Sequence, residues 1–381
     1  MIPYGRQHIT PEDEAAVLAV LRSDYLTQGP RVPAFEAAVC AATGAPHAVA
    51  TNSATSSLHV ACLALGLGPG GLLWTSPITF VASANVGRLC GAEVDFVDID
   101  PETFNMDPAA LEARLDAAAR TGRLPDVIMP VHMCGQSCDM AAIGALARRH
   151  GVRVIEDASH AIGARLGETP VGDCAHSDIC VFSFHPVKIV TTAEGGVATT
   201  RDPRLARAME RLRSHGVTRE PSEMEGESDG PWYYQQIELG LNYRMTELQA
   251  ALGISQMARL DDYVARRTAL ADAYDAALSG LPLRLPGRQP GARSSWHLYV
   301  VRVAPERRRA VFEALRADGI GANVHYIPVH LQPWWRRQGF APGDFPAAEA
   351  YYAGAISLPL YPGMTGQDQA QVVAALGRAL A

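Results

Sequence analysis

Residues 152–160 (VRVIEDASH) and 179–188 (ICVFSFHPVK) decide the fold of this 381-residue chain. In each stretch a short apolar run, Val152–Ile155 or Ile179–Ser183, leads directly into polar side chains. Similar runs recur at Leu72–Thr75, Glu93–Val97, Val127–Val131 and Val197–Thr200. Helical patterns such as Ser53–Leu65, Pro108–Ala119 and Met140–His150 lie between them. Strands that alternate with helices predict an α/β fold with a mostly parallel central sheet covered by helices on both faces.

The rhythm changes in the last third of the chain. One long helical pattern fills residues 257–280, and a proline-rich connection follows it. The predicted elements beyond that point are strand Trp296–Val303, helix Arg307–Asp318, strands Asn323–Ile327 and Ile356–Leu360, and helix Gly366–Leu380. We therefore expect a large domain over residues 1–256, including the N-terminal segment. The linking helix and a small C-terminal α+β domain would then occupy residues 257–381.

Composition excludes several classes of protein. The chain has 33 Lys+Arg against 40 Asp+Glu, and a net charge of −7 argues against a nucleic-acid binder, which needs a basic face. It contains no run of 18 apolar residues to span a membrane and no signal-peptide pattern at its start. Its seven cysteines follow no disulfide framework. These features predict a globular cytoplasmic protein.

The basic residues divide unequally, into 32 arginines and one lysine, Lys188. Arginine supplies surface charge as well as lysine does, but only an amine can lose its proton and attack a carbonyl group. A single lysine can also be left over from codon bias, so its surroundings must decide between the two explanations.

Two further features suit a phosphorylated aldehyde cofactor. Residues 52–57 (NSATSS) precede a helical pattern, and a helix N-terminus with hydroxyls binds phosphate, although an ordinary helix cap has the same sequence. Asp157 follows a predicted parallel strand, at the edge of the sheet where ligands bind, and could pair with a protonated ring nitrogen. With Lys188 for the aldehyde, the set fits pyridoxal 5′-phosphate (PLP).

Other patterns favour structural explanations. Residues 66–71 (GLGPGG) match the glycine spacing of dinucleotide sites, but they follow a helix and precede a strand, which is the wrong order. His132, Cys134 and Cys138 suggest a metal site, yet no second Cys/His pair has zinc-finger spacing. Buried cysteines that act as small apolar side chains are the favoured explanation, and the roles of Cys134 and Cys138 stay open. Near the N-terminus we expect a helix from Pro11 to about Ser23 and an irregular loop over residues 24–33.

Several motifs in a fixed order make the chain resemble the DegT-type sugar-nucleotide aminotransferases, which are fold-type I PLP enzymes. They are NSAT at 52–55, TSPITF at 75–80, EDASH at 156–160, FSFHPVK at 182–188, EGG at 194–196, RSHG at 213–216 and NYRMTE at 242–247. The resemblance covers nearly the whole chain. Within the family, LTQG at 26–29 and the DASH and SFHPVK strings resemble the transaminases of pseudaminic acid biosynthesis most.

The resemblance implies a role for each matching residue. Lys188 and Asp157 would be catalytic, Lys188 as the covalent link to PLP and the proton carrier, and Asp157 as the partner of the ring nitrogen. The other cofactor contacts would be Ser53, Ala54, Thr55, Phe80, His160, Ser183 and, from the neighbouring subunit of a homodimer with shared sites, Asn242. Candidate substrate contacts are Tyr4, Gln28, His215, Arg244, His325 and Tyr326. Ala193 departs from the family, where glycine is often found, and should slightly restrict the backbone.

The implied reaction transfers an amino group from L-glutamate to C4 of a UDP-linked 4-keto-6-deoxy-N-acetylhexose. Its product would be UDP-4-amino-4,6-dideoxy-N-acetyl-β-L-altrosamine. Three alternatives remain: a TDP- or GDP-linked substrate, a PLP-binding regulator without turnover, and the related sugar dehydratases. The dehydratases replace the lysine with histidine, so Lys188 argues against them.

Overall fold

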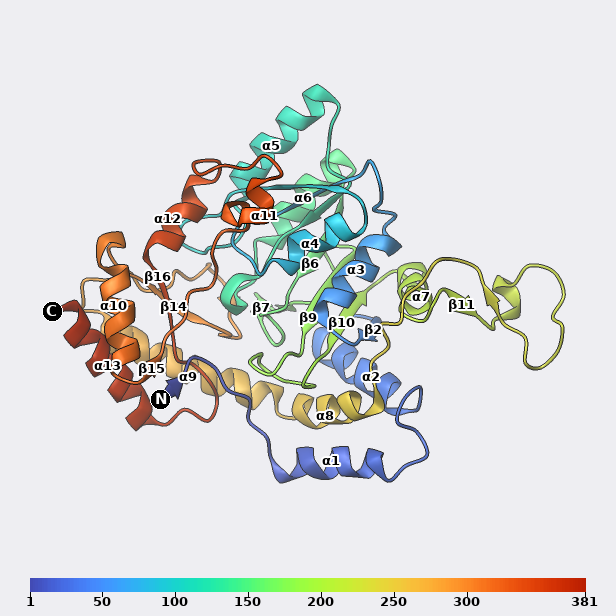
Figure 1. Cartoon of the computed structure of the whole chain (residues 1–381), viewed down its shortest axis with the longest axis horizontal. Helices are drawn as coiled ribbons and strands as arrows, with labels where there is room; N and C mark the ends of the chain where they lie inside the picture. Colours follow the sequence, from blue (N-terminus) through green and yellow to red (C-terminus); the bar gives the residue numbers. More distant parts are fainter.

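A seven-stranded sheet forms the centre of the computed structural model, which describes all 381 residues (Figure 1). Its spatial order is β2-β10-β9-β6-β5-β3-β4, and β10 alone runs antiparallel to its neighbours. The strands are β2 (His47–Thr51), β3 (Leu72–Thr75), β4 (Glu93–Phe96), β5 (Val127–Met129), β6 (Arg153–Asp157), β9 (Ile179–Ser183) and β10 (Gly196–Thr200). All six predicted runs are therefore strands of a mostly parallel sheet, and β2 adds a seventh that we did not predict.

Helices cover both faces of this sheet because its side chains alternate between two cores. In β9, Ile179 and Val181 join one core, and Cys180 and Phe182 join the other. The first face carries α3 (Ala54–Ala64), α4 (Ala82–Leu89) and α7 (Pro203–Leu212). The second carries α2 (Arg31–Thr43), α5 (Pro108–Thr121), α6 (Met140–His150) and α8 (Glu247–Met257). This arrangement confirms the predicted α/β fold class.

Two boundaries near these helices differ from the expectation. The loop predicted over residues 24–33 ends early, because α2 begins at Arg31. Pro33 lies in the first turn of α2, where its missing N–H leaves no helical hydrogen bond unmade. The long pattern predicted over residues 257–280 corresponds to α9 (Leu260–Leu278), which begins after α8 has ended at Met257. The helix α1 (Pro11–Leu21) packs along α8.

The C-terminal third has its own apolar core, packed against α9. Its sheet pairs are β14 (Tyr299–Arg302) with β16 (Ala355–Leu358) and β15 (Ile320–Gly321) with β1 (Ile2–Pro3), so the N-terminus lies beside the C-terminal helices (Figure 1). The helices are α10 (Pro305–Ala317), α11 (Pro333–Arg336), α12 (Pro346–Gly354) and α13 (Gly366–Leu380). The division of the chain into domains at residue 257 stays a prediction.

The predicted strand Asn323–Ile327 is wrong. Only Asn323 pairs with a strand, through Ser357, and the following residues leave the sheet. Two side-chain contacts hold them there: Tyr351 Oη donates to the His325 carbonyl at 2.6 Å, and His325 Nδ1 lies 2.8 Å from Ser357 Oγ. Residues 324–327 are therefore irregular, and they bring His325 and Tyr326 to the wall of a pocket.

Smaller elements complete the fold. A three-stranded sheet consists of β7 (Arg165–Leu166), β8 (Thr169–Pro170) and β13 (Ala292–Arg293). The pair β11 (Val217–Thr218) and β12 (Gln235–Gln236) forms an arm that projects from the body of the molecule (Figure 1). Single 3-10 turns lie at Met133–Gly135, Pro221–Glu223 and Val329–Leu331. None of the helices has both the length and the apolar character needed to cross a bilayer.

Candidate active site

A pocket of about 840 Å³ opens at the edge of the sheet where β2, β3, β6 and β9 have their carboxyl ends. Parallel strands place the residues that follow them side by side at this edge, the usual position of ligands in such sheets. Eleven of the residues implied by the family resemblance line it: Tyr4, Ser53, Ala54, Thr55, Phe80, Asp157, His160, Ser183, Lys188, His325 and Tyr326.

Lys188 lies in the loop that follows β9, where its backbone N–H donates to the His185 carbonyl at 2.9 Å. Burial in the pocket lowers the pKa of Lys188 to about 8, although the nearby Asp157 carboxylate opposes the shift. About a tenth of its amino group is therefore unprotonated at pH 7, far more than for a lysine of ordinary pKa, and the unprotonated amine is the nucleophile.

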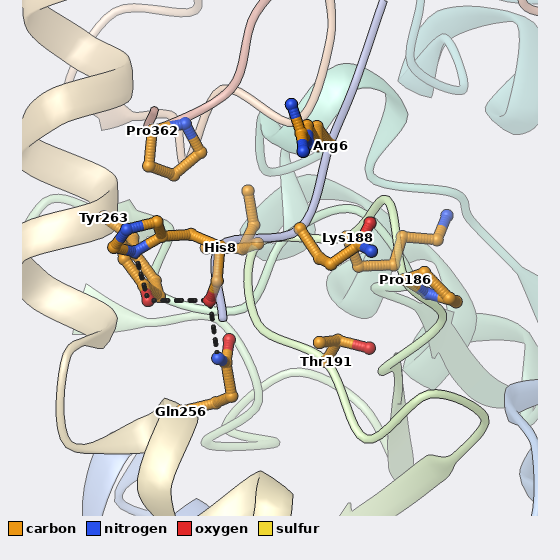
Figure 2. A pocket seen from close by; sticks show the side chains of 10 residues that line it. Arg6, His8, Pro186, Lys188, Thr191, Gln256, Tyr263 and Pro362 are labelled. Atoms are coloured by element: carbon orange, nitrogen blue, oxygen red, sulfur yellow. Dashed lines mark hydrogen bonds between the residues drawn. The ribbon is translucent and has the colours of Figure 1, made fainter. Parts of the chain in front are cut away.

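The N-terminal segment covers the back of the Lys188 loop. Figure 2 shows a narrow recess behind the loop, and the amino group of Lys188 points away from it. His8 fixes the segment there: its carbonyl accepts from Gln256 Nε2 at 2.9 Å, and its Nδ1 lies 3.2 Å from Tyr263 Oη. The loop is thus enclosed from behind, and its lysine is directed into the large pocket.

Asp157 ends β6 with its carboxylate held by three hydrogen bonds. Ser83 Oγ donates to Oδ2 at 2.6 Å, and the hydroxyl and backbone N–H of Ser159 donate to Oδ1 at 2.6 and 3.1 Å. Thr79 Oγ1 lies 2.7 Å from Ser83 Oγ and extends the network. Sequence reasoning missed Thr79 and Ser83, because nothing in their sequence context distinguishes them from ordinary hydroxyls near a helix start.

Glu156, the neighbour of Asp157 at the end of β6, lies outside the pocket. It is 4% exposed and lies 2.7 Å from His132 Nε2 on the opposite face of β6. The backbone N–H of Cys138 donates to His132 Nδ1 at 2.9 Å, which leaves the ring proton on Nε2, where it is donated to Glu156. Cys134 and Cys138 are free and buried, and no group of three or more His, Cys, Asp or Glu side chains is arranged to hold a metal ion.

The N-terminus of α3 faces the pocket with unused donors. Ser53 Oγ caps the helix by accepting from Ser56 N at 3.1 Å, but the backbone N–H groups of Ala54 and Thr55 have no acceptor within the chain. The strand β10 approaches so closely that a Cβ on Gly196 would lie 2.5 Å from Ala54 N, so only glycine fits there. Two free N–H groups at a helix N-terminus form an anion site.

Aromatic side chains form the remaining wall. His160 Nε2 lies 3.2 Å from Tyr326 Oη, and their rings stack with centroids 6.1 Å apart. Tyr4 packs against His325 at 5.1 Å. Phe80 is 59% exposed although it lies within the pocket, which leaves one face of its ring free for a flat ligand.

Four predicted residues lie outside the pocket of a single chain: Gln28, His215, Asn242 and Arg244. Gln28 and Asn242 are exposed, and Arg244 Nη1 donates to Ser214 Oγ at 3.2 Å. A bridge between Thr27 and Thr246 places the loop of Gln28 beside the segment of Asn242 and Arg244. The loop of Gln28 and the segment of Asn242 and Arg244 therefore lie on one surface of the chain.

The residues of the pocket fit PLP on three observations. A buried amine is available for the aldehyde, a carboxylate for the ring nitrogen, and two unpartnered N–H groups for the phosphate. The lone lysine, the predicted helix start and the aspartate after a strand predicted the same assignment, and the structure brings all three to one pocket.

Comparisons with known proteins agree with this geometry. The sequence model of the DegT/DnrJ/EryC1/StrS aminotransferase family matches residues 7–377. The Bacillus subtilis (strain 168) spore coat polysaccharide biosynthesis protein SpsC is 40% identical over 382 aligned residues, which cover 98% of this chain and 96% of SpsC.

Solved structures show the same similarity over the whole fold. Helicobacter pylori PseC, described as an aminotransferase involved in the biosynthesis of pseudoaminic acid, is 30% identical with a TM-score of 0.90, over 100% of this chain and 99% of PseC. Streptococcus pneumoniae Spr1654, a sugar aminotransferase by its description and solved in its PMP form, is 28% identical with a TM-score of 0.91, again over 100% and 99% of the two chains.

Proposed function

This chain belongs to the DegT/DnrJ/EryC1/StrS aminotransferase family and is a PLP-dependent sugar aminotransferase of fold type I, and we propose its substrate, its residue roles and its assembly from that premise. The proposed reaction transfers the amino group of L-glutamate to C4 of a UDP-linked 4-keto-6-deoxy-N-acetylhexose, in the cytoplasm. Its product is UDP-4-amino-4,6-dideoxy-N-acetyl-β-L-altrosamine, of the pseudaminic acid pathway. Similarity to PseC over the whole chain supports this choice of sugar.

The observation that carries the aminotransferase chemistry is Lys188, the one lysine of the chain, at the pocket wall with a pKa near 8. PLP, when bound, supplies an electron sink and a carrier for the amino group. With the cofactor in place, Lys188 Nζ would be the group that moves a proton to C4 of the sugar, because an amine of this pKa can both accept and release a proton near neutral pH.

The other pocket residues bind and orient in this proposal. Asp157, fixed by three hydrogen bonds, would hold the protonated ring nitrogen of the cofactor. The N–H groups of Ala54 and Thr55, with the Ser53 and Ser183 hydroxyls, hold the phosphate, and Phe80 stacks on the ring.

One feature of the pocket supports a shared site. The ligand carries a pyrophosphate, yet none of the chain's 32 arginines lines the pocket. We infer that a second copy of the chain supplies the missing cation, in a homodimer. Gln28, His215, Asn242 and Arg244 are the candidate contributors, since they lie outside the pocket of their own chain.

The substrate is tested by comparing kcat/KM, with glutamate as donor, for three nucleotide sugars. They are the UDP-linked 4-keto sugar of β-L-arabino configuration, its D-xylo epimer and a TDP-linked 4-keto sugar. The ratio kcat/KM measures discrimination between competing substrates. We expect it to be highest for the β-L-arabino sugar. A preference for the TDP sugar would contradict the pathway assignment and leave the aminotransferase activity intact.

A further inference from the structure

His297 lines the pocket but carries none of the roles assigned so far. It is 4% exposed and belongs to the segment that leads into β14. The backbone on both sides of it is fixed: Ser295 N donates to the Gly135 carbonyl at 3.0 Å, and Leu298 N donates to the Cys134 carbonyl at 3.3 Å. A rigid segment therefore presents the imidazole ring to the pocket.

The ring of His297 packs on that of His160, with centroids 4.4 Å apart and an angle of 47° between the planes. No group of the chain hydrogen bonds to either nitrogen of His297, and its Nδ1 is fully enclosed. The edge of the ring that reaches the pocket must therefore carry Nε2. A buried polar side chain without any partner is uncommon and costly, which indicates that a partner arrives with the ligand.

The charge state of His297 decides what kind of partner this is. Burial, and then the groups that face it, His160, Lys188, Arg267 and His325, hold the pKa of His297 well below its ordinary value. The imidazole is therefore neutral, with one N–H and one bare nitrogen. With the proton on Nε2, the enclosed Nδ1 carries no N–H that would lack an acceptor. The nitrogen that faces the pocket is therefore a hydrogen-bond donor.

His160 does not offer the same donor. Its Nε2 is engaged with Tyr326 Oη at 3.2 Å, and its Nδ1 is enclosed within the wall. His297 is thus the imidazole of this stacked pair whose outward nitrogen has no partner in the protein.

We propose that His297 is a further binding residue of the site, whose Nε2–H donates a hydrogen bond to an oxygen of the ligand held next to Lys188. The inference rests on the proposed function, which supplies two such oxygens: the ring oxygen of PLP and an oxygen of the keto sugar.

The first test follows the ring nitrogens of His297 by ¹⁵N NMR in the wild-type protein, with His297→Phe to identify the signals. In the cofactor-free protein, we expect a neutral ring protonated on Nε2 down to pH 5.5. Addition of PLP alone shifts the Nε2 signal if the ring oxygen is the acceptor. Addition of the keto sugar to the PLP-loaded protein shifts the Nε2 signal if a sugar oxygen is the acceptor. No shift with either ligand, or a titration near the ordinary pKa of about 6.5, overturns the proposal.

The second test compares His297→Phe, which keeps a ring against His160 and removes the donor, with His297→Asn, which retains an N–H. For the phenylalanine variant we expect the affinity for PLP, or kcat/KM for the sugar, to fall about ten- to a hundredfold, the usual effect of losing a hydrogen bond to a charged or buried acceptor. Asparagine should restore part of this loss. His150→Asn, at a histidine remote from the pocket that pairs with Asp116, is the matched control and should stay within about twofold of wild type.

The result separates this inference from the proposed function. Borohydride should still fix PLP to Lys188 in His297→Phe, because the lysine chemistry does not depend on the new contact. A phenylalanine variant with unchanged PLP affinity, PLP absorption spectrum and kcat/KM overturns the role of His297 while the aminotransferase stands. If the phenylalanine variant does not fold, His297→Asn identifies the signals instead, and the NMR measurement on the wild-type protein decides.

Discussion

Lys188 is the residue on which the chemistry depends, and its uniqueness allows a clean test. Borohydride reduction of the PLP-loaded protein should fix the cofactor to a single internal peptide, the one that contains Lys188. Because burial lowers the pKa of this amine to about 8, the rate of PLP capture by the cofactor-free protein should rise with pH and level off above that value. Stopped-flow absorbance measures that rate.

Two substitutions complete the Lys188 prediction. Lys188→Ala should lose transamination, and Lys188→Arg should fail equally, since a guanidinium does not form an imine at neutral pH. Turnover by Lys188→Ala would show that another group moves the proton.

Ala193 departs from the family pattern, and we expect this departure to lower the free energy of unfolding. It occupies the left-handed region with φ of 66°, in an exposed part of the loop between Lys188 and β10. An L-residue is strained there and glycine is not, so Ala193→Gly should raise the free energy of unfolding by about 0.5–1 kcal/mol, net of the entropy that glycine adds to the unfolded chain.

Urea unfolding measures the effect of Ala193→Gly. Ala175→Gly, at an exposed loop position without a positive φ, is the control and should be destabilised. Equal losses at both positions would show that the backbone at Ala193 is unstrained.

At the scale of the elements, the parallel strands could be predicted because each is a buried apolar run that ends in polar residues. The strand β2 was missed since its sequence, HAVAT, is short and contains two alanines. The segment Asn323–Ile327 was misassigned because its Val, Tyr and Ile residues are typical of strands, whereas Tyr351 and Ser357 hold it outside the sheet. Residue preferences of this kind are overridden by contacts with distant side chains, which the local sequence does not reveal.

The residues of the candidate site also divide into those that the sequence could predict and those that it could not. Lys188, Asp157 and the start of α3 could be predicted because each follows a strand that ends at the same edge of the sheet. Thr79, Ser83 and His297 could not, because their roles come from contacts with Asp157 and His160 that lie 74 or more residues away along the chain. Sequence also cannot say which chain a residue serves, and Gln28 and Arg244 depend on that distinction.

At the scale of the whole molecule, the apolar surface of the projecting arm supports association with a second copy. Trp232 and Leu239 are 70% and 85% exposed there, on the segment that leads to Asn242 and Arg244. Exposed aromatic and leucine side chains of this size are typical of interfaces, and soluble oligomers most often form symmetric dimers. We propose that a dimer that buries the arm also brings Arg244 to the partner's pocket, which has no arginine of its own.

Mixing two inactive variants tests this assembly. In a dimer of a Lys188→Ala chain with an Arg244→Ala chain, a shared arrangement leaves one site with both wild-type residues and one site with neither. After subunit exchange at equal concentrations, half of the molecules are such mixed dimers, so activity should recover to roughly a quarter of the wild-type value. The matched control mixes Lys188→Ala with Asp157→Asn, whose two residues line the same pocket of one chain and should never recover. Exchange itself is verified by mass spectrometry of the mixed dimer. Mixed dimers that form and stay inactive in the first experiment would show that Arg244 serves its own chain.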